Sequence, residues 1–169
     1  MICVLSDTHG ADNHRLDGQL LDTVREAELV IHAGDFTTER VLDAFEAESQ
    51  EIRAVYGNNA TPTVRERLPA ERVVEHEGAT IALTHGDGHD ETELALFGRQ
   101  ADADIVVSGH SHQPGVTDTG EIVLLNPGSH ADPRWYRPGY AALDVEEGRI
   151  EGRLHEPDGE LFEEFTVGL

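Results

Sequence analysis

The sequence predicts an α/β fold, counted as α+β in some schemes, in which two β-sheets form a sandwich with helices outside. Two observations support this prediction. The first half alternates short apolar runs with amphipathic stretches, and the second half is rich in short strand-like runs separated by turns. Because 169 residues with 38% hydrophobic content can form one core without disulfides, we expect a single domain over residues 1–169.

In the first half, apolar runs predict strands at residues 2–6, 28–33 and 52–56. Apolar side chains recur at helical spacing between them, which predicts helices over residues 14–27 and 38–47.

The second half contains shorter runs that predict strands and hairpins, with one helix over residues 90–101. The predicted strands cover residues 72–76, 80–85, 104–109, 115–119, 121–126, 139–145, 149–156 and 160–167.

The charge balance is unusual. The chain has 34 acidic and 12 basic residues, a formal net charge of −22, and every basic residue is arginine. Such charges repel one another, and salt weakens the repulsion because the Debye length falls from about 10 Å at about 0.1 M to about 3 Å at about 1 M. The composition resembles that of proteins from extreme halophiles, so we predict adaptation to a cytosol of very high salt. An acidic protein adapted to ordinary salt is the alternative.

Composition also bears on partners and location. The negative charge disfavours nucleic acid binding through phosphate neutralisation. The N-terminus has no basic segment followed by a long apolar one, and no run of about 18 apolar residues occurs, so we expect a cytoplasmic protein without a membrane partner. A homo-oligomer is left open. The only cysteine, Cys3, lies in an apolar run and is expected in the core.

Five short polar clusters each follow a predicted strand. They are SDTHG at 6–10, AGD at 33–35, GNN at 57–59, THGDGH at 84–89 and SGHSH at 108–112. The markers of the clusters, which are 28, 23, 27 and 25 residues apart, are Asp7, Asp35, Asn58, His85 and His110. Each interval suits one strand, a connection and a return. Because loops at the carboxyl ends of strands in an open α/β sheet converge on one edge, we predict that the clusters form one site.

The residue types in these clusters suit a pair of first-row divalent cations. A carboxylate can bridge two ions, an imidazole supplies a nitrogen ligand, and an asparagine amide supplies a neutral oxygen. The absence of thiolates disfavours a structural zinc site, and the imidazoles disfavour an all-oxygen calcium site. We expect two divalent metal ions, manganese first, with nickel, iron, cobalt and zinc left open.

Two of the motifs are weak when taken alone. Asp7 and His9 also fit an N-cap aspartate beside a surface histidine. His110 and His112 are two residues apart on an extended segment, so they point to opposite sides, and either each serves a different metal or one is a surface residue. The conjunction of all five clusters, in this order and at this spacing, favours the metal site.

The ordered set D-x-H, G-D, G-N, H-G and G-H-x-H resembles the calcineurin-like metallophosphoesterase superfamily, and the short chain resembles its small single-domain phosphodiesterase branch. The segments NPGS at 126–129 and PR at 133–134, with the following strand YAALD, are similar to the closing part of that branch. The match therefore runs from residue 1 to about residue 145.

This resemblance implies a four-layer αββα sandwich of two mixed sheets flanked by helices. It also implies a dinuclear centre with three groups of ligands. The first metal would be held by Asp7, His9 and His112, the second by Asn58, His85 and His110, and Asp35 would bridge the two.

The implied activity is that of a metal-dependent phosphoesterase, with a phosphodiesterase favoured. Two cations about 3.5 to 4 Å apart lower the pKa of a shared water and supply a hydroxide nucleophile near neutral pH. We expect a small phosphoester substrate, since no lid domain or extended basic groove is evident in the sequence. The alternative is a metal-binding scaffold or interaction subunit of the same fold with little activity.

One position departs from the family pattern. Many members have a histidine after the G-N pair that resembles a general acid, and the small branch often has cysteine and aspartate, whereas this chain has Asn59 and Ala60. An amide is not a useful acid, so the leaving group would take its proton from water or from another residue such as His89 or His130, unless an activated ester needs none. Asn59 is expected either to bind a substrate oxygen or to form a turn, and the catalytic acid stays unassigned.

Five further residues are of interest. His32 is expected to be a satisfied strand-end histidine rather than a support of the site, and Asp87 either orients the neighbouring ligand histidine or forms a turn. Arg134, Trp135 and Arg137 form a basic and aromatic island that either recognises the substrate or clamps a loop.

Overall fold

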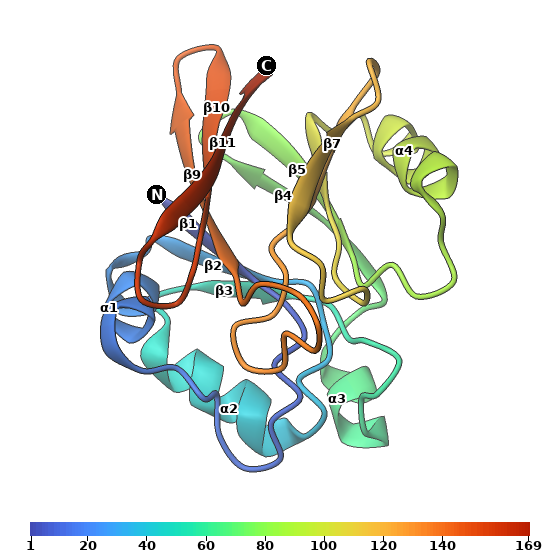
Figure 1. Ribbon diagram of the computed structural model, residues 1–169. Helices are drawn as coiled ribbons and strands as arrows, with labels where there is room; N and C mark the ends of the chain where they lie inside the picture. Colours follow the sequence, from blue (N-terminus) through green and yellow to red (C-terminus); the bar gives the residue numbers. More distant parts are fainter.

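The computed structural model describes residues 1–169 as two mixed sheets with helices on their outer faces (Figure 1). The six-stranded sheet has the order β11-β10-β9-β1-β2-β3, and the five-stranded sheet has the order β4-β5-β6-β8-β7. The strands of the first sheet are β1 (Ile2–Leu5), β2 (Leu29–His32), β3 (Ile52–Ala54), β9 (Tyr140–Glu146), β10 (Arg149–His155) and β11 (Leu161–Gly168). Those of the second are β4 (Glu71–His76), β5 (Ala79–Thr84), β6 (Ile105–Val107), β7 (Gly115–Asp118) and β8 (Val123–Asn126).

Each sheet has a parallel part. In the first sheet β1, β2 and β3 are parallel, and in the second β5, β6 and β8 are parallel. Antiparallel strands flank them: β9, β10 and β11 form a meander, and β4 and β7 are the edge strands of the second sheet. The carboxyl ends of parallel neighbours lie at one edge of a sheet, so the loops that follow these strands can meet.

Three apolar clusters separate four layers. One lies between the sheets, a second joins the first sheet to α1 (Gly18–Glu26) and α2 (Glu39–Glu48), and a third joins the second sheet to α4 (Glu91–Gln100). In Figure 1, α1 and α2 lie at the lower left and α4 lies at the upper right. The predicted four-layer αββα sandwich of two mixed sheets is therefore confirmed.

Strand β1 is apolar throughout because both of its faces are covered. Ile2 and Val4 belong to the cluster between the sheets, whereas Cys3 and Leu5 belong to the cluster under α1 and α2. Alternate side chains of a strand point to opposite faces, so a strand covered on both faces needs a continuous apolar run. Burial raises the pKa of the Cys3 thiol to about 12, in agreement with the predicted core position.

The helix α3 (Pro62–Arg67) was not predicted from the sequence. It has six residues and one buried side chain, Val64, so it leaves little apolar periodicity to detect. Its start does carry a signal, because Thr61 caps the helix through its side chain and Pro62 occupies the first turn. None of the four helices is long and apolar enough to cross a membrane.

Candidate metal centre

All seven predicted ligand residues lie in loops that follow strands, and their polar atoms converge. Asp7 and His9 follow β1, Asp35 follows β2, Asn58 follows β3, His85 follows β5, and His110 and His112 follow β6. The two sheets thus contribute to the same centre, as the cluster spacing predicts.

One half of the centre is formed around the carboxylate of Asp7. Its Oδ1 lies 3.4 Å from Nε2 of His112 and 3.8 Å from Nε2 of His9. These three atoms are buried and have no hydrogen-bond partner. The other oxygen of Asp7, Oδ2, accepts hydrogen bonds from the Ser6 hydroxyl at 2.7 Å and from the backbone N–H of His110 at 2.9 Å. The carboxylate is therefore fixed so that Oδ1 faces the two imidazoles.

The other half is formed around Asp35 and Asn58. Oδ2 of Asp35 lies 3.4 Å from Nε2 of His85 and 3.3 Å from Nε2 of His9, so Asp35 stands between the two halves. Oδ1 of Asn58 lies 3.1 Å from Nε2 of His85 and 3.2 Å from Nδ1 of His110. Asp35 therefore lies between the two groups of side chains.

The donor atoms of this centre fit a cation. Nδ1 of His85 lies 2.7 Å from the carbonyl oxygen of Ala33, and Nδ1 of His112 contacts the carbonyl oxygen of Asp132. A carbonyl can only accept, so Nδ1 carries the hydrogen in both rings and Nε2 of the neutral ring has a lone pair. Both lone pairs face carboxylate oxygens, an arrangement that repels unless a proton or a metal ion lies between.

The pKa shifts of the carboxylate and imidazole groups at the centre also indicate that it favours positive charge. Burial alone would raise the pKa of Asp35, but the neighbouring His85 and two hydrogen bonds from Asn59 outweigh burial and hold it well below its usual range. Burial would lower the pKa of His85, yet Asp35 raises it above its ordinary value. The pKa of His9 is raised chiefly by the nearby carboxylate of Asp7. Without a cation, the carboxylates therefore favour protons on the imidazoles.

The backbone of the centre is strained. Positive φ angles occur at Asp7 (54°), His9 (47°), Asp35 (59°), His110 (66°) and His112 (62°). Residues with a Cβ rarely adopt this left-handed backbone conformation, and each residue held in it costs of order 1 kcal/mol or more of stability. Strain concentrated on five of the seven predicted ligand positions indicates that the geometry of these side chains is maintained at the expense of stability.

Several supporting residues were not predicted from the sequence. Arg65, on α3, donates hydrogen bonds to the carbonyl oxygens of Gly57, Asn58 and Ala60 and so holds the loop that carries Asn58. The hydroxyl of Ser129 donates to the carbonyl oxygen of Asp7 at 2.7 Å. Ser129 belongs to the NPGS segment, whose similarity to the family pointed to this region.

The glycines that precede Asn58 and His110 make room for the carboxylates. A Cβ on Gly57 would lie 2.6 Å from the backbone nitrogen of Asp35 and would overlap its carboxylate. A Cβ on Gly109 would overlap the Ser6 hydroxyl and lie 2.6 Å from Oδ2 of Asp7. The G-N and G-H pairs therefore each combine a predicted ligand with a close approach that only glycine permits.

Gly57→Ala is expected to lower the free energy of unfolding by about 1–3 kcal/mol, because the overlap involves backbone atoms that no rotamer change can relieve. Denaturant unfolding measures the change. Gly168→Ala is the matched control, since a Cβ there meets no atom within 4 Å. Equal stability of the two variants would contradict the packing described for Gly57.

Asn59 lies against the carboxylate of Asp35. Its backbone N–H donates to Oδ1 at 2.9 Å and its side-chain amide donates to Oδ2 at 2.8 Å. The amide nitrogen is thus directed at Asp35, and the residue orients the carboxylate shared by the two halves.

The two histidines named as proton donors lie in different places. His130 packs beside Phe45, and its Nε2 lies 3.0 Å from the carbonyl oxygen of His14, while its Nδ1 is buried without a partner. Burial lowers the pKa of His130 to about 4, so the ring is neutral near pH 7. His89 is exposed and lines a cavity beside His110. Of the two, only His89 faces a space that adjoins the centre.

His32 is a satisfied strand-end histidine, as expected. Its Nε2 lies 2.9 Å from the Thr8 hydroxyl, and its Nδ1 accepts a hydrogen bond from the backbone N–H of Gly34. These contacts also join the loops that carry Asp7 and Asp35. Asp87 makes no hydrogen bond to His85, whose Nδ1 is occupied by Ala33.

The residues of the basic and aromatic island lie in two different environments. Arg137 pairs with Glu156 at 3.3 Å and lies 4.8 Å over the ring of Phe162, so it clamps the loop. Trp135 is 91% exposed, and Arg134 has a φ of 54° in the same turn. The loop-clamp interpretation therefore fits Arg137.

Residues 1–148 match the calcineurin-like phosphoesterase superfamily domain. The chain is 32% identical over 158 residues to a probable metallophosphoesterase of Methanothermobacter thermautotrophicus, with 91% of each chain covered. It is 27% identical over 157 residues to a phosphodiesterase of Methanocaldococcus jannaschii, with 86% of this chain and 93% of that protein covered. The structure of Vps29 from Entamoeba histolytica complexed with zinc shares the fold, with a TM-score of 0.78, 21% identity and coverage of 99% of this chain and 98% of that one.

Proposed function

The chain belongs to the calcineurin-like phosphoesterase superfamily, and we propose that it is a metal-dependent phosphodiesterase that hydrolyses a P–O ester at the centre described above. One observation carries this proposal. Three buried atoms without partners, Oδ1 of Asp7 and Nε2 of His9 and His112, meet beside the carboxylate of Asp35. Such an arrangement is unfavourable in a purely structural role and is suited to a cation.

We propose two divalent ions, manganese first, with the predicted ligands. Asp7, His9 and His112 would hold one ion, Asn58, His85 and His110 would hold the other, and Asp35 would bridge them. Nitrogen and oxygen donors without thiolates suit manganese and its first-row neighbours. The phosphodiesterase activity of the related Methanocaldococcus jannaschii protein supports the choice of a diester.

When bound, such a pair of ions would lower the pKa of a water near the phosphoryl group and would neutralise charge on the phosphoryl oxygens. The contribution of the chain is to preset the ligands. The carbonyls of Ala33 and Asp132 fix the ring orientation of His85 and His112, and Asn59 fixes the carboxylate of Asp35. Ligands fixed in this way need no rearrangement to bind, which favours both affinity and rate.

The leaving group has no strong acid of the chain directed at it. The amide of Asn59 donates to Asp35 and cannot act as a general acid. His89 lines the neighbouring cavity and is the candidate donor named above that lies on that side of the centre. We therefore expect activated aryl esters, which need little protonation, to be hydrolysed faster than alkyl esters.

The test is hydrolysis of bis-p-nitrophenyl phosphate and p-nitrophenyl phosphate in molar KCl by protein stripped with a chelator. We expect no turnover by the stripped protein, recovery with manganese or nickel, and a higher kcat/KM for the diester. A folded protein that is inert with every divalent ion would contradict the proposal.

The second candidate is a metal-binding interaction subunit of the same fold with little activity. The absence of an acid at position 59 favours it. Such a subunit would bind divalent ions with the same ligands and leave both esters intact, so the hydrolysis assay combined with a metal-binding measurement separates the two functions.

A further inference from the structure

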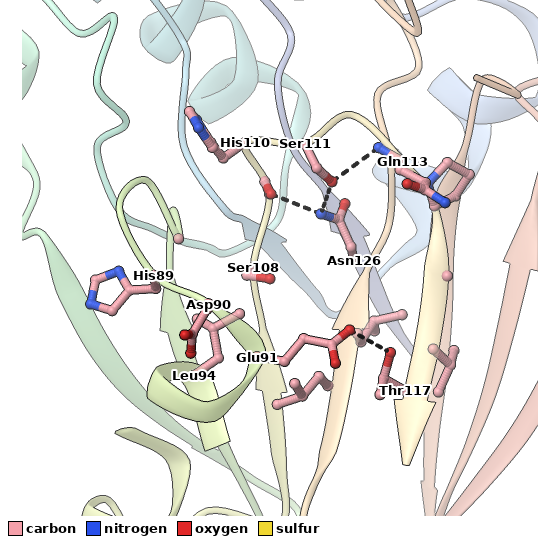
Figure 2. A pocket seen from close by; sticks show the side chains of 17 residues that line it. His89, Asp90, Glu91, Leu94, Ser108, His110, Ser111, Gln113, Thr117 and Asn126 are labelled. Carbon is pink, nitrogen blue, oxygen red and sulfur yellow. Dashed lines mark hydrogen bonds between the residues drawn. The ribbon is translucent and has the colours of Figure 1, made fainter. Parts of the chain in front are cut away.

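A cavity of about 600 Å³ adjoins the metal centre on the side of His110. It lies between the loop after β6, the start of α4, and the strands β7 and β8, as Figure 2 shows. His110 and Ser111 stand at one end, and Glu91 and Thr117 face each other at the other end (Figure 2). Its volume is that of a site for a small organic molecule.

The cavity exists because the second sheet is only partly covered. One helix, α4, packs on its outer face, and the edge strand β7 carries Gly115 at the cavity wall. A Cβ at Gly115 would meet no atom within 4 Å, and its φ is not in the left-handed region. Glycine is therefore not required by the backbone here, and the missing side chain keeps the cavity open.

The lining combines apolar walls with an unused hydrogen-bonding group. Leu94 and Leu124 contribute apolar surface. Ser108 is 6% exposed and lines the same cavity, and its hydroxyl makes no hydrogen bond within the chain. The hydroxyl is open to the cavity, so it is available to a hydrogen-bond partner supplied by a ligand.

The charge of the lining selects against anions. Asp90 and Glu91 are at the cavity, and no arginine lines it. The N–H of Glu93 at the start of α4 is already bonded to the side chain of Asp90, so the helix end does not offer it to an anion. Carboxylates and a serine hydroxyl accept hydrogen bonds from hydroxyl groups, whereas a second phosphate would be repelled.

We propose that this cavity holds the organic group of the substrate, and that this group is uncharged, bears hydroxyls and is of sugar or nucleoside size. The inference rests on the proposed phosphodiesterase function, because the phosphoryl group would lie at the centre beside His110. Apolar walls would contact the faces of the ring, and Ser108 and Glu91 would bind its hydroxyls. Binding energy from this group would favour the correctly placed ester.

The test compares two esters with the same leaving group, p-nitrophenyl thymidine 5′-phosphate and methyl p-nitrophenyl phosphate. In the wild type, we expect kcat/KM to be at least about tenfold higher for the thymidine ester. Gly115→Phe fills the cavity and is expected to abolish this preference, with the methyl ester changed less than about twofold. Gly168→Phe, at a strand glycine with equally open space in β11, is expected to change neither ester.

Two further measurements separate the inference from the proposed function. Saturation-transfer NMR with thymidine needs no hydrolysis, and we expect transfer from the wild type and Gly168→Phe but not from Gly115→Phe. A 3′-phosphate on the thymidine ester is expected to lower kcat/KM, and Glu91→Gln is expected to reduce that penalty. If no ester is hydrolysed but thymidine transfer is retained, the phosphodiesterase proposal is contradicted and the cavity assignment is not. Equal effects of Gly115→Phe on both esters, or thymidine transfer that survives it, would overturn the cavity assignment.

Discussion

Asp35→Asn is expected to lower kcat/KM for bis-p-nitrophenyl phosphate by at least about 1000-fold, beyond the about 10- to 100-fold typical of residues that only support a ligand. Asp35 is the carboxylate shared by the two halves of the centre, with Oδ2 near Nε2 of both His9 and His85. Asparagine keeps the shape of the side chain but removes its negative charge. Its NH₂ group would either face an N–H donor of Asn59 or displace a metal ion.

Asp87→Asn is the matched control for this prediction. Asp87 is an exposed carboxylate two residues from His85 and makes no hydrogen bond to it, so the same loss of charge leaves the ligands in place. We expect its kcat/KM to stay within about threefold of the wild type, as for a surface carboxylate screened by salt. Similar losses in the two variants would show that general charge, rather than the shared ligand, governs the rate.

The melting temperature is expected to rise by about 10 °C or more between about 0.1 M and about 2 M KCl, which for a chain of this size corresponds to a few kcal/mol. The net charge is −22, and eight of the twelve arginines already pair with acidic side chains. The remaining carboxylates repel one another in dilute salt. Molar salt screens this repulsion, so we propose that the protein is adapted to high salt.

A variant with Glu147→Gln and Glu164→Gln tests the cause of the salt effect. Both residues are exposed and take part in no ion pair, so their replacement removes two charges and no contact. We expect a higher melting temperature in dilute salt and a shallower rise with KCl. A wild-type melting temperature that falls as KCl is added would contradict the halophilic interpretation.

The fold was predictable where burial dictates the sequence pattern. The strands β1, β2 and β6 are buried on both faces and therefore read as continuous apolar runs, and α1 and α2 show one apolar stripe. Helix α3 was missed because a single buried valine leaves no stripe. Its capping threonine and the proline that follows are the sequence signals that mark its start.

The convergence of the five polar loops was predictable, but the geometry of their side chains was not. The spacing of the polar clusters indicates that the loops meet, since each cluster follows a strand of a parallel part. The positive φ angles of Asp7 and Asp35 depend on how the loops close over each other, which no local pattern reports. The contact of Asn59 with Asp35 depends in the same way on the packing of two loops 24 residues apart. The cavity beside His110 also depends on packing, because its position is set by the part of the second sheet that α4 leaves uncovered.

The most direct test of the proposed centre is a count of the ions that it binds. Chelator-stripped protein is dialysed to equilibrium against manganese in molar KCl, and the metal per chain is measured in the wild type and in Asp35→Asn. The proposed ligand set predicts two ions per chain in the wild type and fewer than two in the variant. A folded wild-type protein that binds one ion or none, or a variant that still binds two with unchanged affinity, would contradict it.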